Sequence, residues 1–283
     1  MNEKPRIGLL GIMQELYDDM VPGITEHQAE YARSVAERLD PSVEAIFPGP
    51  ARNREDVERV VRELIANRVD GIVIVMLTYG PAMRTVRALM EAQVPLALLN
   101  IQPERSVTAD WDMSDLTYNQ GIHGAQDQAN ALVRAGLPFS VITGDWRSEG
   151  FASAFADWAR TARTVTALKR TRIALLGYPM NGMGDILYDP PALLRRLGPT
   201  IVSEDLGALV RRIDEVADAD AEALLTEHHE RFAVADDLPP ARHAYAARIE
   251  LAIRSLLAER DYRAFSFHSV SYTHLRAHET GRN

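Results

Sequence analysis

Short apolar runs alternate with amphipathic stretches from the first residues of the chain onward. The run GIVIVMLT (71–78) is continuous and β-branched, which is typical of a parallel strand covered on both faces. Further apolar runs predict strands at residues 6–12, 43–47, 95–100, 138–143 and 171–177. Between the runs, apolar residues recur at helical spacing, for example at Val57, Val60, Val61, Leu64 and Ile65. The alternation predicts an α/β fold with a doubly wound, Rossmann-like parallel sheet.

Local signals place several of the helices. Thr25 and Gln28 have the spacing of a capping box, which predicts a helix from Thr25 to about Leu39. A second helix is expected from Pro81 to about Ala92, and a third through ASAFADWARTARTV at residues 152–165.

The length of 283 residues suits about two domains. We predict an N-terminal Rossmann-like domain over residues 1–145 and a second, incomplete α/β domain over residues 146–270. The second domain is expected to contain a weak strand at 200–204, acidic or alanine-rich helices within 205–259 and a strand at 264–268.

Composition narrows the classes of partner. The formal charge of −9 argues against nucleic acid or an anionic membrane surface as partner, because both require clustered Lys and Arg. The chain has no cysteine, which excludes disulfides, thiolate catalysis and cysteine metal sites. Neither a membrane span nor an export signal is apparent, so we expect a cytoplasmic protein.

Ligands of open parallel sheets bind beyond the carboxyl ends of the strands. Neutral amides, aromatic residues and a few acids follow the predicted strands, namely Gln14, Tyr79, Asn100, Gln102, Glu104, Asp145, Trp146, Asn181 and Asp185. No phosphate-binding glycine motif occurs, which argues against a nucleotide. Amides both donate and accept hydrogen bonds, so this set suits an uncharged polyhydroxylated ligand such as a sugar.

The segment SDLTYNQGIHGAQDQANAL (114–132) adds a cluster of polar residues at a helix start. We predict a helix from about Asn119 whose buried stripe contains Ile122, Ala125, Ala129, Leu132 and Val133. The opposite side would carry Gln120, His123, Asp127 and Arg134. Asp127 lies one turn after His123 and could orient its imidazole, while Gly121 and Gly124 would permit close approach. A surface histidine beside helix-start glycines is the ordinary alternative.

The order of these pieces resembles the L-arabinose isomerase branch of the L-fucose/L-arabinose isomerase family. The resemblance rests on GIMQELYDD, DGIVIVMLTYGPAM, LNIQPE and DMSDLTYNQGIHGAQDQAN, and spans roughly residues 5–185. It implies a cytoplasmic ketol isomerase that interconverts aldoses and ketoses with a divalent metal, usually Mn²⁺. It also implies two α/β domains followed by a β-rich domain, in a homo-oligomer whose sites lie between subunits.

The resemblance also implies roles for individual residues. Gln14, Leu16 and Tyr79 look like sugar-contacting positions, Gln120 and His123 look like a polar wall, and Met183 looks like part of the lining. Tyr79 stands where arabinose isomerases commonly carry another aromatic residue, and MQEL differs from their more usual SQHL.

Aldose–ketose isomerisation moves a proton between C1 and C2, which requires an acid/base pair and a metal that polarises both oxygens. The family supplies these groups as two glutamates and two histidines in later parts of its chains. We therefore expect an N-terminal fragment that retains sugar contacts, has no catalytic or metal residues of its own, and is inactive alone.

Two other groups of histidines are not expected to bind a metal. His274 and His278 have the spacing of two ligands on a helix, but residues 271–283 lack apolar periodicity and resemble a translated sequencing-adapter read-through. We therefore interpret them as a non-native tail. His228, His229 and His243 are predicted to be surface residues.

Two other classes stay open. One is a non-catalytic sugar-binding or sensor domain of the periplasmic-binding-protein type, and the other is a divergent paralogue that keeps the fold with altered activity. The untruncated reading frame would separate the isomerase from the binding domain, because two glutamates and two histidines downstream favour the enzyme, whereas a stop soon after residue 270 favours the binding domain.

Overall fold

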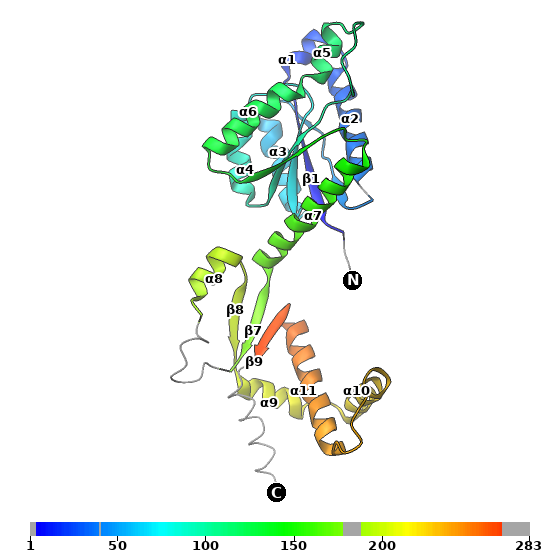
Figure 1. Ribbon diagram of the computed structural model, residues 1–283. Helices are drawn as coiled ribbons and strands as arrows, with labels where there is room; N and C mark the ends of the chain where they lie inside the picture. The colour runs from blue at the N-terminus through cyan, green and yellow to red at the C-terminus, as the bar shows by residue number, and fades with distance from the viewer. Residues whose placement is uncertain (1–3, 40, 178–187, 268–283) are drawn as a thin grey trace. The chain divides into compact units, whose positions relative to one another are not determined.

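The computed structural model describes residues 4–39, 41–177 and 188–267. The chain divides into two compact units, Met1–Ala167 and Leu168–Asn283, called unit 1 and unit 2 below. Both are α/β units built on parallel sheets, as Figure 1 shows, so the predicted fold class is confirmed.

The sheet of unit 1 has six parallel strands in the order β2-β1-β4-β5-β6, with β3 paired to β1 beside β2. The strands are β1 (Arg6–Ile12), β2 (Glu44–Ile46), β3 (Pro50–Ala51), β4 (Gly71–Met76), β5 (Leu96–Asn100) and β6 (Phe139–Thr143). All residues of β4 are buried, as its continuous apolar run predicts. The direction of winding reverses between β1 and β4, so the carboxyl ends of these two strands mark the topological switch point of the sheet.

Helices cover both faces of this sheet (Figure 1). One core includes residues of α2 (Ile24–Leu39) and α7 (Glu149–Arg170). The other includes residues of α3 (Arg54–Ala66), α4 (Val86–Ala92) and α6 (Gly121–Arg134). The short helices α1 (Leu16–Met20), η1 (Ala82–Arg84) and α5 (Met113–Asn119) lie in the connections. Two covered faces explain why the central strands contain so few polar residues.

Unit 2 contains a three-stranded parallel sheet in the order β8-β7-β9. Its strands are β7 (Arg172–Leu176), β8 (Thr200–Glu204) and β9 (Ala264–Phe267). Its helices are α8 (Pro190–Leu197), α9 (Leu206–Asp214), α10 (Asp218–Arg231) and α11 (Pro240–Glu259). Asp189 and Asp205 cap α8 and α9 by accepting hydrogen bonds from main-chain N–H groups. The core of the unit joins β7 to α9 and α11.

The first unit extends further along the chain than the predicted boundary at residue 145. Helix α7 contributes Phe151, Phe155, Ala159 and Ala162 as buried residues, and the first three belong to the core that also holds strands β1, β4 and β5. An amphipathic helix is assigned to the unit that buries its apolar stripe, and residue composition does not reveal which unit that is.

The predicted capping box at Thr25 and Gln28 is wrong. Helix α2 begins at Ile24, so Thr25 lies inside it and its hydroxyl donates to the Asp18 carboxylate instead of capping. Gln28 is fully buried and donates from Nε2 to the Tyr118 carbonyl at 2.8 Å. The capping-box spacing is therefore coincidental, because tertiary contacts use both side chains.

The buried stripe of α6 also differs from the prediction. Ile122 and Val133 are 46% and 67% exposed. The residues that α6 buries are Gly121, Gly124, Ala125, Gln128 and Leu132. Ala125 and Leu132 are thus buried as predicted, while Gly121 and Gly124, which lie against the β4 backbone, are buried in place of Ile122 and Val133.

Candidate functional site

The loops after β1 and β4 meet at the carboxyl edge of the unit 1 sheet. Leu77 donates its N–H to the Ile12 carbonyl at 2.7 Å. A Cβ added to Gly80 would lie 2.7 Å from Ile12 Cγ2 and 3.2 Å from the Met13 carbonyl oxygen. This direct backbone packing brings the segments that carry Gln14 and Tyr79 to the same place, the switch point of the sheet.

Helix α6 begins at the same edge. A Cβ on Gly121 would lie 2.6 Å from the Met76 carbonyl oxygen, and a Cβ on Gly124 would lie 3.5 Å from the Gly80 nitrogen. The first turn of α6, which contains His123 and follows Gln120, is thus in contact with the end of β4. Glycine is required there because any side chain would separate the helix from the strand.

The structure therefore places the segments of four predicted site residues, Gln14, Tyr79, Gln120 and His123, around one edge. Gln14, Tyr79 and Gln120 are half-buried, and His123 is exposed. Leu16 is the first residue of α1 and is 53% exposed. Met183 lies outside the described residues. That these side chains bind a ligand stays a prediction.

Asp127 is used differently from the predicted pairing with His123. Its Oδ2 accepts a hydrogen bond from the Ala82 N–H at 3.0 Å, across 45 residues of sequence. Ala82 begins η1, directly after the loop that carries Tyr79. The carboxylate thus holds that loop. This role could not be predicted from the sequence, because it depends on where α6 packs in the fold.

Other loop residues named from the sequence are occupied by contacts with protein groups. Asn100 donates from Nδ2 to Thr143 Oγ1 at 3.3 Å. Asp145 forms ion pairs with Arg105 at 2.9 Å and with Arg147 at 3.7 Å. These groups lie at the ends of β5 and β6, further along the same edge.

Sequence reasoning missed a buried polar group on the α2 side of the sheet. Tyr31 and Trp146 meet edge to face with ring centroids 5.8 Å apart, and burial raises the pKa of Tyr31 above its usual range. The Tyr31 hydroxyl, the Trp146 Nε1 and the Gln28 Oε1 are buried and have no partner within the described residues. Gln28 and Tyr31 share the apolar stripe of α2, which is the signal that could have identified them.

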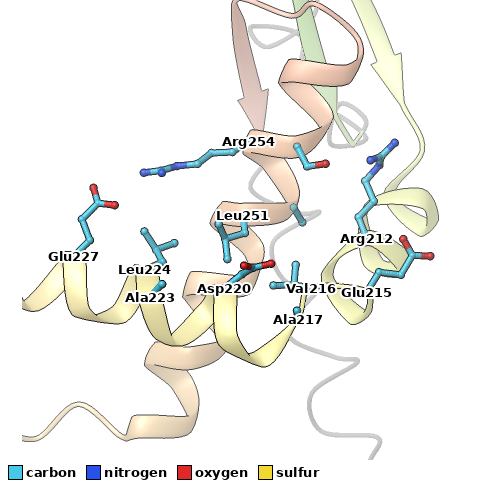
Figure 2. A pocket seen from close by; sticks show the side chains of 12 residues that line it. Arg212, Glu215, Val216, Ala217, Asp220, Ala223, Leu224, Glu227, Leu251 and Arg254 are labelled. Atoms are coloured by element: carbon cyan, nitrogen blue, oxygen red, sulfur yellow. The ribbon is translucent and has the colours of Figure 1, made fainter.

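Two cavities lie away from this edge. One of about 270 Å³ is a groove between α3 and α4, lined by residues such as Val61 and Ala88. The other, of about 650 Å³, lies between α9, α10 and α11 of unit 2, and Figure 2 shows Arg212, Asp220 and Arg254 around it. Arg212 is paired with Glu259 at 2.6 Å, so the charge of this guanidinium is already compensated within the chain.

The prediction of three surface histidines in unit 2 is wrong for His243, which is half-buried, and for its equally half-buried neighbour His228. The Nδ1 of His228 lies 3.0 Å from His243 Nε2, and its Nε2 lies 3.1 Å from Glu250 Oε2. The two imidazole rings stack at a centroid distance of 5.3 Å. Helix–helix packing brings the carboxylate to the histidine across 22 residues, a separation that no local motif reveals.

Metal donors do not converge within the described part of the chain. Among residues 4–39, 41–177 and 188–267, no group of three or more His, Asp or Glu side chains is arranged to hold a metal ion. The two ring nitrogens of His228 face different partners, His243 and Glu250, so these three side chains do not point toward a common centre. The described residues therefore do not fit a resident Mn²⁺, and no metal-dependent step is assigned to them. Within those same ranges, none of the helices is both long and apolar enough to cross a membrane.

Fold and site together define a doubly wound α/β protein whose candidate ligand surface, built from amide, phenol and imidazole residues, lies at the switch point. A family model described as the L-arabinose isomerase N-terminal domain matches residues 3–170, and one described as the L-arabinose isomerase central domain matches residues 192–276. The chain therefore belongs to the L-arabinose isomerase family.

Individual relatives agree with this assignment. An L-arabinose isomerase of Nocardioides sp. is 30% identical over 264 residues, covering 89% of this chain and 52% of the relative. That of Herpetosiphon aurantiacus is 28% identical with the same coverage, and that of Thermotoga petrophila is 29% identical over 69% of this chain and 40% of the relative. The chain spans about half the length of the curated relatives it matches.

One similar solved structure is a periplasmic solute-binding protein from Actinobacillus succinogenes with bound D-allose. The match covers 79% of this chain and 65% of that protein's chain, at 16% sequence identity and a TM-score of 0.27.

Proposed function

We propose that this chain is the sugar-contacting part of a cytoplasmic aldose–ketose isomerase of the arabinose type, which works as a homo-oligomer with Mn²⁺. The observation that supports this most directly is the backbone contact between the loops after β1 and β4, which brings Gln14 and Tyr79 to one edge beside α6. Switch points of doubly wound sheets are where such folds bind ligands.

The residues at this edge suit a neutral polyol. Gln14 and Gln120 each offer a donor and an acceptor, and the Tyr79 and His123 side chains can do both. Hydroxyl groups of a sugar require such mixed partners, whereas a phosphorylated ligand would call for Lys, Arg or a glycine-rich nest. Leu16 and Met183 would provide apolar contacts to the sugar carbons.

Proton transfer belongs to residues outside this set in our proposal. These residues bind and orient the sugar. The acid/base pair and the metal ligands come from other parts of the complete enzyme. We therefore expect the 283-residue chain to bind a pentose without isomerising it.

The test combines binding and turnover with the complete 283-residue chain. Calorimetric titration with L-arabinose should detect binding, and Gln14→Ala, Tyr79→Ala and His123→Ala should each weaken it by about three- to tenfold, the effect of one lost hydrogen bond. Asn130→Ala, at an exposed position further along α6, is the matched control and should leave the affinity unchanged.

Turnover is measured on the same samples with Mn²⁺ and L-arabinose, by following ketose formation. Ketose production above the protein-free rate would overturn the proposed inactivity of this chain. Equal affinities for the wild type and all three site variants would overturn the proposed sugar site.

A further inference from the structure

Two adjacent side chains of α6 attach the helix to the loop after β4. Asp127 Oδ2 accepts from the Ala82 N–H at 3.0 Å. The Oε1 atom of Gln128 accepts a hydrogen bond from the Thr85 hydroxyl at 3.0 Å. Both of these residues are fully buried. Hydrogen bonds inside a protein core are costly to break, because each lost partner leaves a buried polar group unsatisfied.

The bond from Ala82 satisfies an N–H at the start of a short helix. Pro81 precedes η1 and provides no side-chain cap. The carboxylate of Asp127 supplies this cap from another helix, and a charged acceptor at such a position stabilises more than a neutral one. Asp127 is half-buried, which limits competition from water.

The capped loop carries Tyr79, and the capping helix α6 follows Gln120 and contains His123 in its first turn. The glycine contacts lie nearer the start of α6 than Asp127, and a Cβ added to Gly124 would lie 3.4 Å from the Thr78 carbonyl oxygen. The two polar walls of the proposed sugar site are therefore joined by main-chain packing and by the Asp127 carboxylate. The Thr78 hydroxyl also donates to the Tyr79 carbonyl at 2.9 Å, which restricts the loop locally.

We propose that Asp127 is a positioning residue, which fixes the Tyr79 loop against α6 through the Ala82 N–H and so sets the distance between Tyr79 and the Gln120–His123 wall. This inference rests on the proposed sugar site. Asp127 makes no contact with the sugar itself and acts through Tyr79.

The first measurement concerns the loop alone. In hydrogen–deuterium exchange of the complete chain, Asp127→Ala should raise the exchange rate of the segment around Ala82 by about tenfold or more, because the N–H loses its charged acceptor. Asp127→Asn keeps an acceptor oxygen and should change the rate by less than about threefold. Gln126→Ala, at the neighbouring exposed position of α6, is the matched control.

The second measurement tests whether Asp127 acts through Tyr79. Asp127→Ala should weaken L-arabinose binding by about tenfold, while Asp127→Asn should retain most of the affinity. In the Tyr79→Ala background, Asp127→Ala should cause little further loss of affinity, because the side chain through which Asp127 acts is already absent. This double-mutant cycle measures the coupling between the two residues. A full, additive loss in that background would overturn the positioning role, as would unchanged exchange around Ala82 in Asp127→Ala.

The exchange and binding results separate this inference from the proposed function. If the wild type binds no sugar, the proposed function and the positioning of a sugar contact both fail, while exchange still shows whether Asp127 holds the loop. If the wild type binds sugar and Asp127→Ala binds equally well, only the positioning role fails.

Discussion

The central strands of the two sheets differ in how completely they are covered, while the outer strands of both sheets, such as β2 and β6 in unit 1, are only partly buried. In unit 1, β4 is buried at every position and β1 at all positions but its first. In unit 2, β7 is buried at alternate positions only, and β8 and β9 have no fully buried residue. The sequences differ accordingly, since GIVIVM is wholly apolar whereas TIVSE contains polar residues. Apolar continuity along a strand thus reports how many of its faces are covered.

Tryptophan provides a way to follow the two units separately. Trp111, Trp146 and Trp158 all precede residue 168, so intrinsic tryptophan fluorescence reports on unit 1. Far-ultraviolet circular dichroism reports on the helices of both units. The three predictions below use this difference, from the largest expected effect to the smallest.

Removing core volume should affect the two sheets unequally. Ile74→Ala, at a fully buried position of β4, should lower the free energy of unfolding of unit 1 by about 2–5 kcal/mol. Ile173→Ala, at a half-buried position of β7, should cost unit 2 roughly 1 kcal/mol because less apolar surface is lost. Urea unfolding monitored by fluorescence and circular dichroism measures both. Equal costs would contradict the difference in coverage.

A methyl group at the contact between α6 and β4 should be the next largest perturbation. Gly121→Ala places a Cβ 2.6 Å from a main-chain oxygen that cannot rotate away, so unit 1 should lose about 1–3 kcal/mol. Gly150→Ala is the control, because its Cβ meets nothing within 4 Å in helix α7 and alanine favours helices by up to about 1 kcal/mol. Equal melting temperatures for the Gly121→Ala and Gly150→Ala variants would contradict the close contact between α6 and β4.

Acidification should destabilise unit 2 through His243. Partial burial, together with the nearby His228 and His229, lowers the pKa of His243. The unfolded chain, with a histidine pKa of about 6.5, therefore binds this proton more readily than the folded chain. The stabilisation is complete above that value and is lost as the pH falls through the lower folded-state pKa.

The measurement is the melting temperature by circular dichroism between about pH 5 and 8. His243→Gln removes the titrating group and should flatten the pH dependence, whereas the tryptophan transition of unit 1 should change little. An unchanged slope in His243→Gln would show that another group is responsible.

Much of the architecture could be predicted from the sequence. Apolar runs and helical spacing place strands β1, β4, β5 and β8 within a residue or two of their observed bounds, and the βα alternation predicts the parallel, doubly wound sheet. The rule that ligands bind beyond the strand ends is enough to select Gln14 and Tyr79, whose loops do meet. The predictions of the strands and of the edge that these loops share succeed because periodicity and strand polarity are local or topological properties.

Only the tertiary structure decided how individual side chains are used. The hydrophobic pattern assigns Ile122 to the buried face of α6, yet Gly121 and Gly124 occupy it, because the helix rests directly on the β4 backbone. In the same way Asp127 caps η1 instead of orienting His123. Sequence periodicity reveals that a helix has a buried face. The separation between two packed backbones determines which residues can lie on it, and that separation is a property of the assembled fold.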